Sequence, residues 1–190
     1  PGSAARIDAD LAAVRHVVPI AQRAADALMR ALDAKLRWSI RKAQKAGVRV
    51  RRADLEEMDL AQDLYARTMR AKRAPVYYSR ERFACIARDL APGGGGIYLA
   101  TVGDTPVGMA AVIDAATSRH LVQVAVPREH QGTRAADLLV WQVLAEAADA
   151  GKTTFDFMAS AADDAGLLAY KAKWGARADR TVCILNPVFF

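Results

Sequence analysis

The stretch VAVPREHQGTRAADLLVWQVLAEAADAGKTTFDFMASAADDAGLLAYKAKWG, residues 124–175, decides the fold of this chain. It begins at the end of an apolar strand, which Pro127 terminates. A short turn containing Gly132 follows, and an apolar helix begins directly after it. A strand that turns into a helix N-terminus presents free backbone N–H groups to an anion, so this junction favours a phosphorylated ligand.

The flanking residues extend this junction into alternating strands and helices. Period-two alternation places Leu121, Gln123 and Ala125 on one side of the strand and Val122, Val124 and Val126 on the other. A strand over 153–158 and a helix that reaches Lys171 complete a β-α-β-α run. Other segments are expected as an Ala-rich helical region over 4–46 broken at Pro19, helices over 54–73 and 80–90, and strands over 48–51, 97–102, 107–113 and 181–185.

Two motifs in this stretch resemble the GNAT acyltransferase superfamily. The first is the V-x-V-P strand end at 124–127, followed by the Q-G-T-R-A-A turn at 131–136. The second, F-D-F-x(8)-G-L-L-A-Y-K-A-K-W-G at 155–175, is similar to the Fem-type branch, which includes aminoacyl-tRNA-dependent transferases. The resemblance covers roughly residues 48–186. It implies an α/β fold with a mixed, mostly antiparallel central sheet flanked by helices, here with an N-terminal helical extension.

The resemblance also implies an enzyme, an N-acyltransferase that moves an acyl group from acyl-CoA, such as acetyl-CoA, to a small-molecule or peptide amine. The first alternative is aminoacyl transfer from aminoacyl-tRNA to an amine of a cell wall or secondary metabolite, with tRNA as partner. The second alternative is a non-catalytic GNAT-like half, because Fem-type proteins commonly carry two units and this chain shows one. A homodimer, or a chain that lacks an N-terminal GNAT half, stays open. Direct aminolysis needs no covalent nucleophile, and no metal-ligand cluster stands out, so no metal is expected.

The donor is expected to bind at the strand end and on the turn. In the family motif Q/R-x-x-G-x-G/A, Arg134 stands where glycine is usual. Either its guanidinium points outward and pairs with a phosphate, or the backbone site for the coenzyme A pyrophosphate has been lost, as in Fem-type transferases. A third interpretation is that the turn only connects the strand to the helix and binds no ligand. The candidate donor-binding residues are Val124, Ala125, Val126, Gln131, Gly132, Thr133, Arg134, Ala135 and Ala136.

Tyr170 and Lys171 are the candidate catalytic residues under the resemblance. A phenol at Tyr170 would protonate the leaving thiolate without carrying a permanent charge. Lys171 fits the F/Y-K-x-x-F/W-G pattern, where a cation would stabilise a tetrahedral oxyanion or hold a tRNA end. The alternatives are a packed helix tyrosine and a solvated lysine. Lys173, two residues further on, faces elsewhere on the helix.

Acceptor recognition is expected in the basic and aromatic segment between the helices predicted over 54–73 and 80–90. The candidate substrate-binding residues are Arg73, Tyr77, Tyr78 and His130, the last of which lies in the turn. A general base is harder to assign. Glu129, His130, Asp114 and His120 are the candidates.

The charge of the chain is concentrated in one segment. The 190 residues carry a net charge of +6, with 27 Lys and Arg against 21 Asp and Glu. Residues 30–52 hold nine of these cations and one carboxylate, Asp33, so their net charge is +8 and the remainder sums to −2. Such a segment is either a solvated helix face or a surface for a phosphate-rich partner such as tRNA.

Composition predicts a cytoplasmic protein organised in three parts. No apolar run reaches the roughly 18 residues that span a bilayer, and no signal peptide is evident. Cys85 and Cys183 fit no metal or redox spacing and are expected to be reduced and buried. We expect residues 1–3 to be a tag remnant, 4–46 a helical segment and 47–190 the acyltransferase domain.

Overall fold

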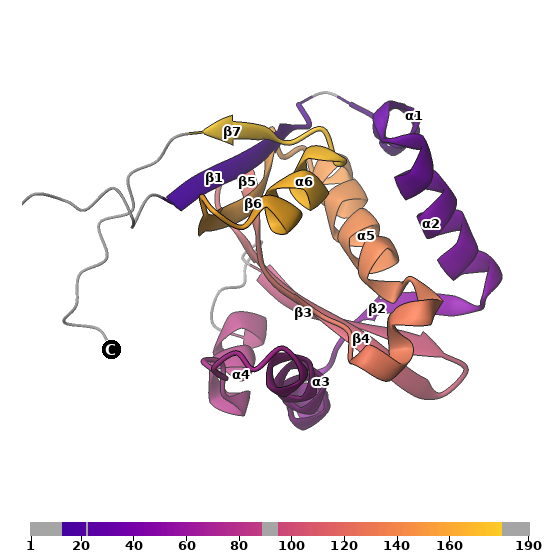
Figure 1. The fold of residues 1–190 in the computed structure, drawn as a ribbon, viewed down its shortest axis with the longest axis vertical. Coiled ribbons are helices and arrows are strands. Elements are labelled where there is room, and N and C mark those ends of the chain that lie inside the picture. Colours follow the sequence, from indigo (N-terminus) through magenta and orange to yellow (C-terminus); the bar gives the residue numbers. More distant parts are fainter. Residues whose placement is uncertain (1–12, 22, 89–94, 180–190) are drawn as a thin grey trace, which may run out of the picture.

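A seven-stranded sheet forms the centre of the computed structural model, which describes residues 13–21, 23–88 and 95–179 (Figure 1). The strands are β1 (Ala13–Pro19), β2 (Val48–Arg52), β3 (Gly95–Val102), β4 (Thr105–Asp114), β5 (Ser118–Ala125), β6 (Thr154–Ala161) and β7 (Arg177–Asp179). The α-helices are α1 (Ala25–Ala31), α2 (Ala34–Lys45), α3 (Met58–Ala71), α4 (Arg80–Arg88), α5 (Ala135–Asp149) and α6 (Ala165–Ala172). Two 3-10 helices are η2 (Leu55–Glu57) and η3 (Arg128–Thr133).

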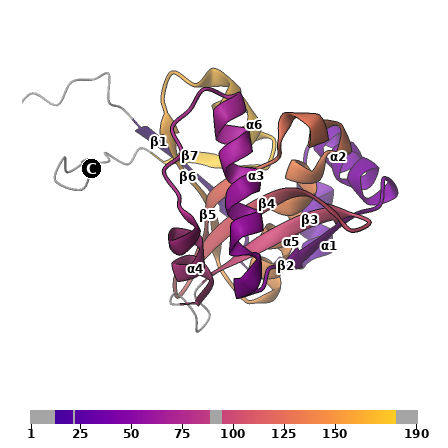
Figure 2. The same cartoon turned by 90° about the horizontal axis from the view of Figure 1, so that it is seen from below.

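Helices cover both faces of the sheet (Figures 1 and 2). Helices α1, α2 and α5 lie on one face, and α3 and α4 lie on the other. Adjacent residues of β3 supply both cores, because Tyr98 and Ala100 join the core under α5 while Ile97 and Leu99 join the core under α3 and α4. The predicted α/β architecture is confirmed.

The sheet order is β2-β3-β4-β5-β6-β1-β7, and its one parallel pair within the described residues is β5 with β6. These two strands pair over three positions, from Ser118 opposite Thr154 to His120 opposite Asp156. Beyond them β5 stays paired with β4 as far as Ala125, and β6 stays paired with β1, its partner from Thr154 to Ala161. The sheet therefore splays open at the C-terminal end of β5.

A β-bulge shifts the side-chain pattern of β5 relative to our prediction. The partners of Val112 and Ala111 on β4 are Leu121 and Gln123, so Val122 is an extra residue in β5. As a result Leu121, Val124 and Val126 face the core under α5, whereas Val122 and Ala125 face α3 and α4. The predicted strict alternation was wrong from Val122 onward, because the bulge resets the phase by one residue.

The N-terminal segment is a second departure. Residues 25–31 and 34–45 are helical as expected, but 13–19 form β1, so the helical prediction is wrong there. The valines Val14, Val17 and Val18 are β-branched and suit an extended backbone better than a helix. Strand β1 lies between β6 and β7, and residues 4–12 lie outside the described ones.

The remaining predicted elements lie within a few residues of their expected bounds. The hairpin between β3 and β4 turns at Gly103 and Asp104, and Asp164 caps α6 by accepting from the backbone N–H of Leu167 at 2.9 Å. Cys85 is exposed on α4, contrary to the expected burial, because Phe83 and Ile86 form the buried face. Cys183 and the predicted strand 181–185 lie outside the described residues.

Candidate acyl-transfer site

A cavity of about 700 Å³ lies at the end of β5, between α2, α3, α5 and α6. Its volume is in the range of a small-molecule site. The predicted residues that line it are Val124, Val126, Gln131, Arg134, Ala136 and Tyr170. The other lining residues are Lys35, Leu36, Trp38, Ser39, Thr68, Lys72, Asp137 and Lys173. A second cavity of about 230 Å³ adjoins it and shares Thr68, Lys72, Val126 and Gln131 with it.

Positive charge dominates the cavity lining. The lining contains four basic side chains and one carboxylate, Asp137. The basic residues are Lys35, Lys72, Arg134 and Lys173. A cleft lined by charges of one sign attracts ligands of the opposite sign, so this lining favours an anionic ligand.

The turn before α5 offers fewer free N–H groups than predicted. The Arg134 N–H donates to Gln131 O at 3.2 Å, and the Ala135 N–H donates to the Thr133 hydroxyl at 3.2 Å. Ala136 follows at the cavity wall. Gly132 and Thr133 are not among the lining residues, Ala135 is fully buried, and Ala125 faces α3 and α4. The N–H groups of Arg134 and Ala135 are therefore already occupied within the turn.

Arg134 holds the backbone conformation that glycine favours. Its φ of 62° and ψ of 23° lie in the left-handed region, and it forms the N-terminal cap of α5. The exposed side chain lines the cavity. The chain thus keeps the turn geometry of a glycine while adding a guanidinium group to the ligand side.

Tyr170 belongs to a hydrogen-bonded trio at the cavity wall. Its hydroxyl donates to Asp137 Oδ1 at 3.2 Å, and the Ser39 hydroxyl donates to Asp137 Oδ2 at 2.5 Å. Burial, and then the charge of Asp137, raise the pKa of Tyr170 well above its usual value. The phenol therefore stays protonated at neutral pH and beyond.

Lys171 does not line the cavity. It is 4% exposed, and its Nζ donates to Phe157 O at 2.9 Å, Met158 O at 2.8 Å and the Ser160 hydroxyl at 2.6 Å. Strand β6 bulges here, because Phe157 and Met158 together stand opposite the single residue His16 of β1. Lys171 binds the carbonyl groups of that bulge, and burial lowers its pKa. It is neither the solvated lysine nor the cavity cation that the sequence suggested.

The predicted acceptor residues lie outside both cavities described above. Tyr78 packs edge-on to Tyr65 and stacks on Phe83, with ring centroids 5.5 and 5.7 Å apart. Arg73 and Tyr77 are exposed, and His130 is part of η3, where its carbonyl accepts from the Thr133 hydroxyl.

The general-base candidates also lie away from the cavity. His120 Nδ1 is 2.9 Å from Asp156 Oδ2, and its Nε2 is 2.9 Å from the Ser118 hydroxyl. The arrangement Ser118–His120–Asp156 resembles a catalytic triad. However, Arg15 also donates to Asp156 Oδ2, and Ser118 lines neither cavity. We assign the cluster to joining β5, β6 and β1. Glu129 pairs with Arg67 on α3.

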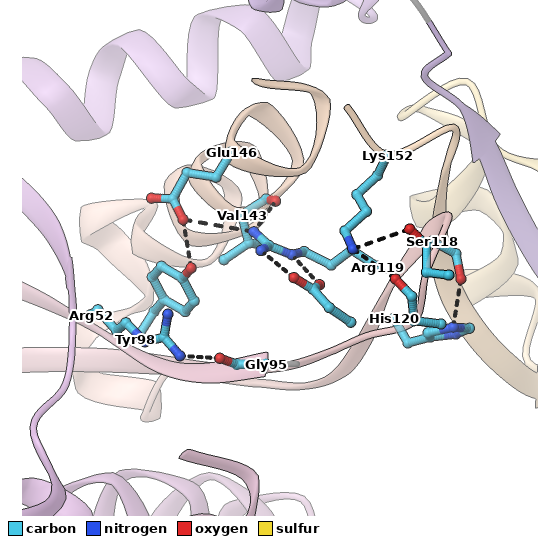
Figure 3. A network of polar contacts seen from close by, with 12 residues as sticks. Arg52, Gly95, Tyr98, Ser118, Arg119, His120, Val143, Glu146 and Lys152 are labelled. Atoms are coloured by element: carbon cyan, nitrogen blue, oxygen red, sulfur yellow. Dashed lines mark hydrogen bonds and ion pairs between the residues drawn. The ribbon is translucent and has the colours of Figure 1, made fainter. Parts of the chain in front are cut away.

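Asp114 belongs to a buried network that fixes α5 on the sheet (Figure 3). Its carboxylate accepts from Arg119 Nε at 2.6 Å and Nη2 at 2.8 Å, and Arg119 also donates to Val143 O. Tyr98 donates to Glu146 at 2.5 Å, and burial raises the pKa of Tyr98 to about 12. These contacts hold the start of β5 and the middle of β3 against α5.

Sequence reasoning missed the contribution of α2. The four-residue spacing of Leu36 and Ile40 shows which face is buried, and Trp38 and Ser39 lie at its margin. No local signal links Asp137 with Tyr170, 33 residues later. Within the described residues no three potential metal ligands gather, and no helix has the length and apolarity needed to cross a membrane.

Comparison with known proteins places this fold among the acetyltransferase-type (GNAT) domains. The family model described as an acetyltransferase (GNAT) domain matches residues 30–172, about three quarters of the chain. The chain therefore belongs to the GNAT acetyltransferase-domain family, as the resemblance predicted, and membership supports acyl transfer as its activity. No match was found among curated proteins.

Solved structures show the same fold at low sequence identity. FemX is similar over 92% of this chain, with a TM-score of 0.76 and 15% identity. The C-terminal domain of a putative lysylphosphatidylglycerol synthetase from Agrobacterium fabrum is similar over 89% of this chain, with a TM-score of 0.62 and 11% identity. A tandem GNAT protein of clavulanic acid biosynthesis is also similar over 89%, with a TM-score of 0.59 and 16% identity. This chain covers 62%, 58% and 51% of those chains respectively.

Proposed function

We propose that this chain is an N-acyltransferase that moves an acyl group from an acyl-CoA donor to an amine. The separation of β5 from β6 after three paired residues carries the proposal, because it places Val124, Val126 and Tyr170 around one cavity. The acyl group would lie at the open end of β5. The phosphates of the donor would lie among the four cations, with side chains performing much of the binding that a backbone cradle performs elsewhere.

Tyr170 and Asp137 would handle the protons. The amine nitrogen attacks the thioester carbonyl carbon, so a C–N bond forms and the C–S bond breaks. Asp137 accepts the proton that the attacking nitrogen loses, and Tyr170 gives its hydroxyl proton to the leaving sulfur. The 3.2 Å contact then returns the proton from Asp137 to Tyr170. In the resting geometry the hydroxyl points at Asp137, so it must turn toward the sulfur when the donor is bound.

A specific observation favours a second donor, aminoacyl-tRNA. The N–H groups of Arg134 and Ala135 are already bonded within the turn, which weakens the case for a pyrophosphate cradle. Exposed cations continue from the cavity along α2 at Arg41, Lys42 and Lys45. Such a band suits a nucleic-acid backbone. The acceptor would then be an amine of a cell-wall or secondary metabolite.

Donor binding tests these assignments by thermal shift. If acyl-CoA is the donor, acetyl-CoA at 100 times its dissociation constant should add about 2.7 kcal/mol to the free energy of unfolding. If aminoacyl-tRNA is the donor, an aminoacylated RNA minihelix should raise the melting temperature, and added salt should abolish that shift. Arg134→Glu should remove the acetyl-CoA shift, whereas Arg49→Glu, an equal charge change on exposed β2, should keep it. If neither donor shifts the transition, the non-catalytic alternative replaces the proposal.

A further inference from the structure

Trp38 is an exposed tryptophan at the wall of the main cavity. It is 56% exposed, although α2 buries Leu36, Ile40 and Ala43 on its other side. Leaving a large indole in water forgoes much apolar burial, and the core under α5 is formed without it. Packing therefore does not explain why this position carries a tryptophan.

Two lysines flank the indole on the same helix. Lys35 lines the cavity three residues before Trp38. Four residues after it, Lys42 places its Nζ over one face of the indole ring, 5.0 Å from the centroid, so a base would stack on the other face. A flat aromatic face beside ammonium groups matches a nucleobase that carries phosphates, because the base stacks on the ring while the phosphates pair with the cations.

We infer that Trp38 is the stacking platform for the adenine of the acyl donor and that Lys35 and Lys42 bind the adjacent phosphates. The inference rests on the proposed function, since coenzyme A and aminoacyl-tRNA both carry a terminal adenosine. It adds a recognition site on α2, a helix outside the strand-turn-helix junction that the sequence motifs mark. It also explains why the cavity extends from Tyr170 to α2.

Three probes, two substitutions of Trp38 and a control variant at Tyr77 separate the contribution of the base from that of the phosphates. The probes are adenosine 3′,5′-bisphosphate, 4′-phosphopantetheine, which has no base, and an RNA minihelix ending in CCA. Calorimetry with Trp38→Leu should show adenosine binding about tenfold or more weaker, the loss expected for one stacking contact, with phosphopantetheine affinity unchanged. Trp38→Phe should restore part of the affinity. Tyr77→Leu, at a 69% exposed tyrosine outside the cavity, should leave the affinities of all three probes unchanged.

The outcomes distinguish this inference from the proposed function. A loss confined to the bisphosphate identifies coenzyme A as the source of the adenosine, and a loss confined to the minihelix identifies tRNA. If wild-type protein binds an adenosine probe and Trp38→Leu binds it equally well, the inference is overturned and the proposed function stands. An equal loss for phosphopantetheine also overturns it. If no adenosine probe binds the wild-type protein, the inference is overturned, and the thermal shifts with the complete donors decide the proposed function separately.

Discussion

Arg134 combines a strained backbone with a charge that faces the ligand cavity. A left-handed conformation costs a residue with a β-carbon roughly 1–2 kcal/mol, and glycine escapes this cost. We expect Arg134→Gly to be as stable as the wild type or up to about 1 kcal/mol more stable, because relief of strain outweighs the added chain entropy. Urea unfolding measures this.

Arg134→Ala is the matched control, since it removes the same charge and keeps the strain. Both variants should lose affinity for acetyl-CoA by the same factor, measured by calorimetry. A glycine variant that is less stable by more than about 1 kcal/mol would show instead that the guanidinium contributes to folding.

In the proposed reaction Tyr170 gives its hydroxyl proton to the leaving sulfur. Phenylalanine keeps the ring and lacks the hydroxyl, so this substitution tests the hydroxyl alone. Tyr170→Phe should lower turnover by about 10²–10⁴-fold, the usual contribution of a general acid, while acetyl-CoA affinity changes little because the ring remains. Steady-state kinetics and calorimetry measure the two quantities. Unchanged turnover would mean that water protonates the leaving sulfur.

Lys171 is expected to act on folding. Replacing it with methionine leaves two carbonyl groups of the β6 bulge and the Ser160 hydroxyl without their donor, which should cost about 1–3 kcal/mol of unfolding free energy. Lys173→Met, an equal charge change at an exposed position of the cavity wall, should stay within about 0.5 kcal/mol. Equal stability of the two variants would contradict this role.

At the scale of elements, η2 and the start of α3 are fixed by a capping box. The Glu57 carboxylate accepts from the Asp54 N–H at 3.0 Å and receives two hydrogen bonds from Arg51 of β2, at 2.7 and 2.6 Å. The hydrogen bond from Arg51 is the main reason that the pKa of Glu57 falls to about 2 from its usual 4.5. A carboxyl group with a lowered pKa stabilises the fold fully above its unfolded value and loses that contribution as pH falls through its folded value.

Glu57→Gln should therefore be less stable than the wild type above pH 4.5, and the difference should vanish as the pH falls to about 2. Because both side chains are partly exposed to solvent, we expect a difference at neutral pH of no more than about 1 kcal/mol. Denaturant titrations at several pH values measure it. A difference that does not change with pH would rule out the ionised carboxylate as its cause.

The sequence was most informative where the signal is local. The positions of proline and glycine and the period-two alternation of apolar residues predicted where β3, β4 and the junction from β5 to α5 lie in the sequence. They did not locate the bulge at Val122, because register depends on the partner strand. The motifs named Tyr170 and Arg134, but Trp38 and Asp137 reach the cavity through the packing of α2 on α5, which no short pattern records.

On the scale of the whole molecule, β1 joins distant parts of the chain into one sheet. It pairs with β6 and β7, and Val18 is 4% exposed in the core under α5. Val17→Pro removes a backbone donor from this strand, so it should lower the free energy of unfolding by more than about 2 kcal/mol. The matched control is Ala25→Pro at the first position of α1, where proline is tolerated.

Equilibrium unfolding of both variants tests this role, and hydrogen exchange locates the change. Protection should fall in β6 and β7 of the Val17 variant and persist in β2 to β4. If protection of β6 is unchanged, β1 behaves as an independent appendage and not as an integral strand.

The position of β1 also has a consequence during synthesis of the protein. Its neighbours in the sheet begin at Thr154 and Arg177, so about 135 residues leave the ribosome before β1 can pair. At elongation rates of about 5–20 residues per second this takes roughly 7–27 seconds. During that interval β2, β3 and β4 can pair with all their neighbours and β5 lacks only β6, whereas β1 lacks both of its partner strands. A holding chaperone at the ribosome exit would find its binding segment there.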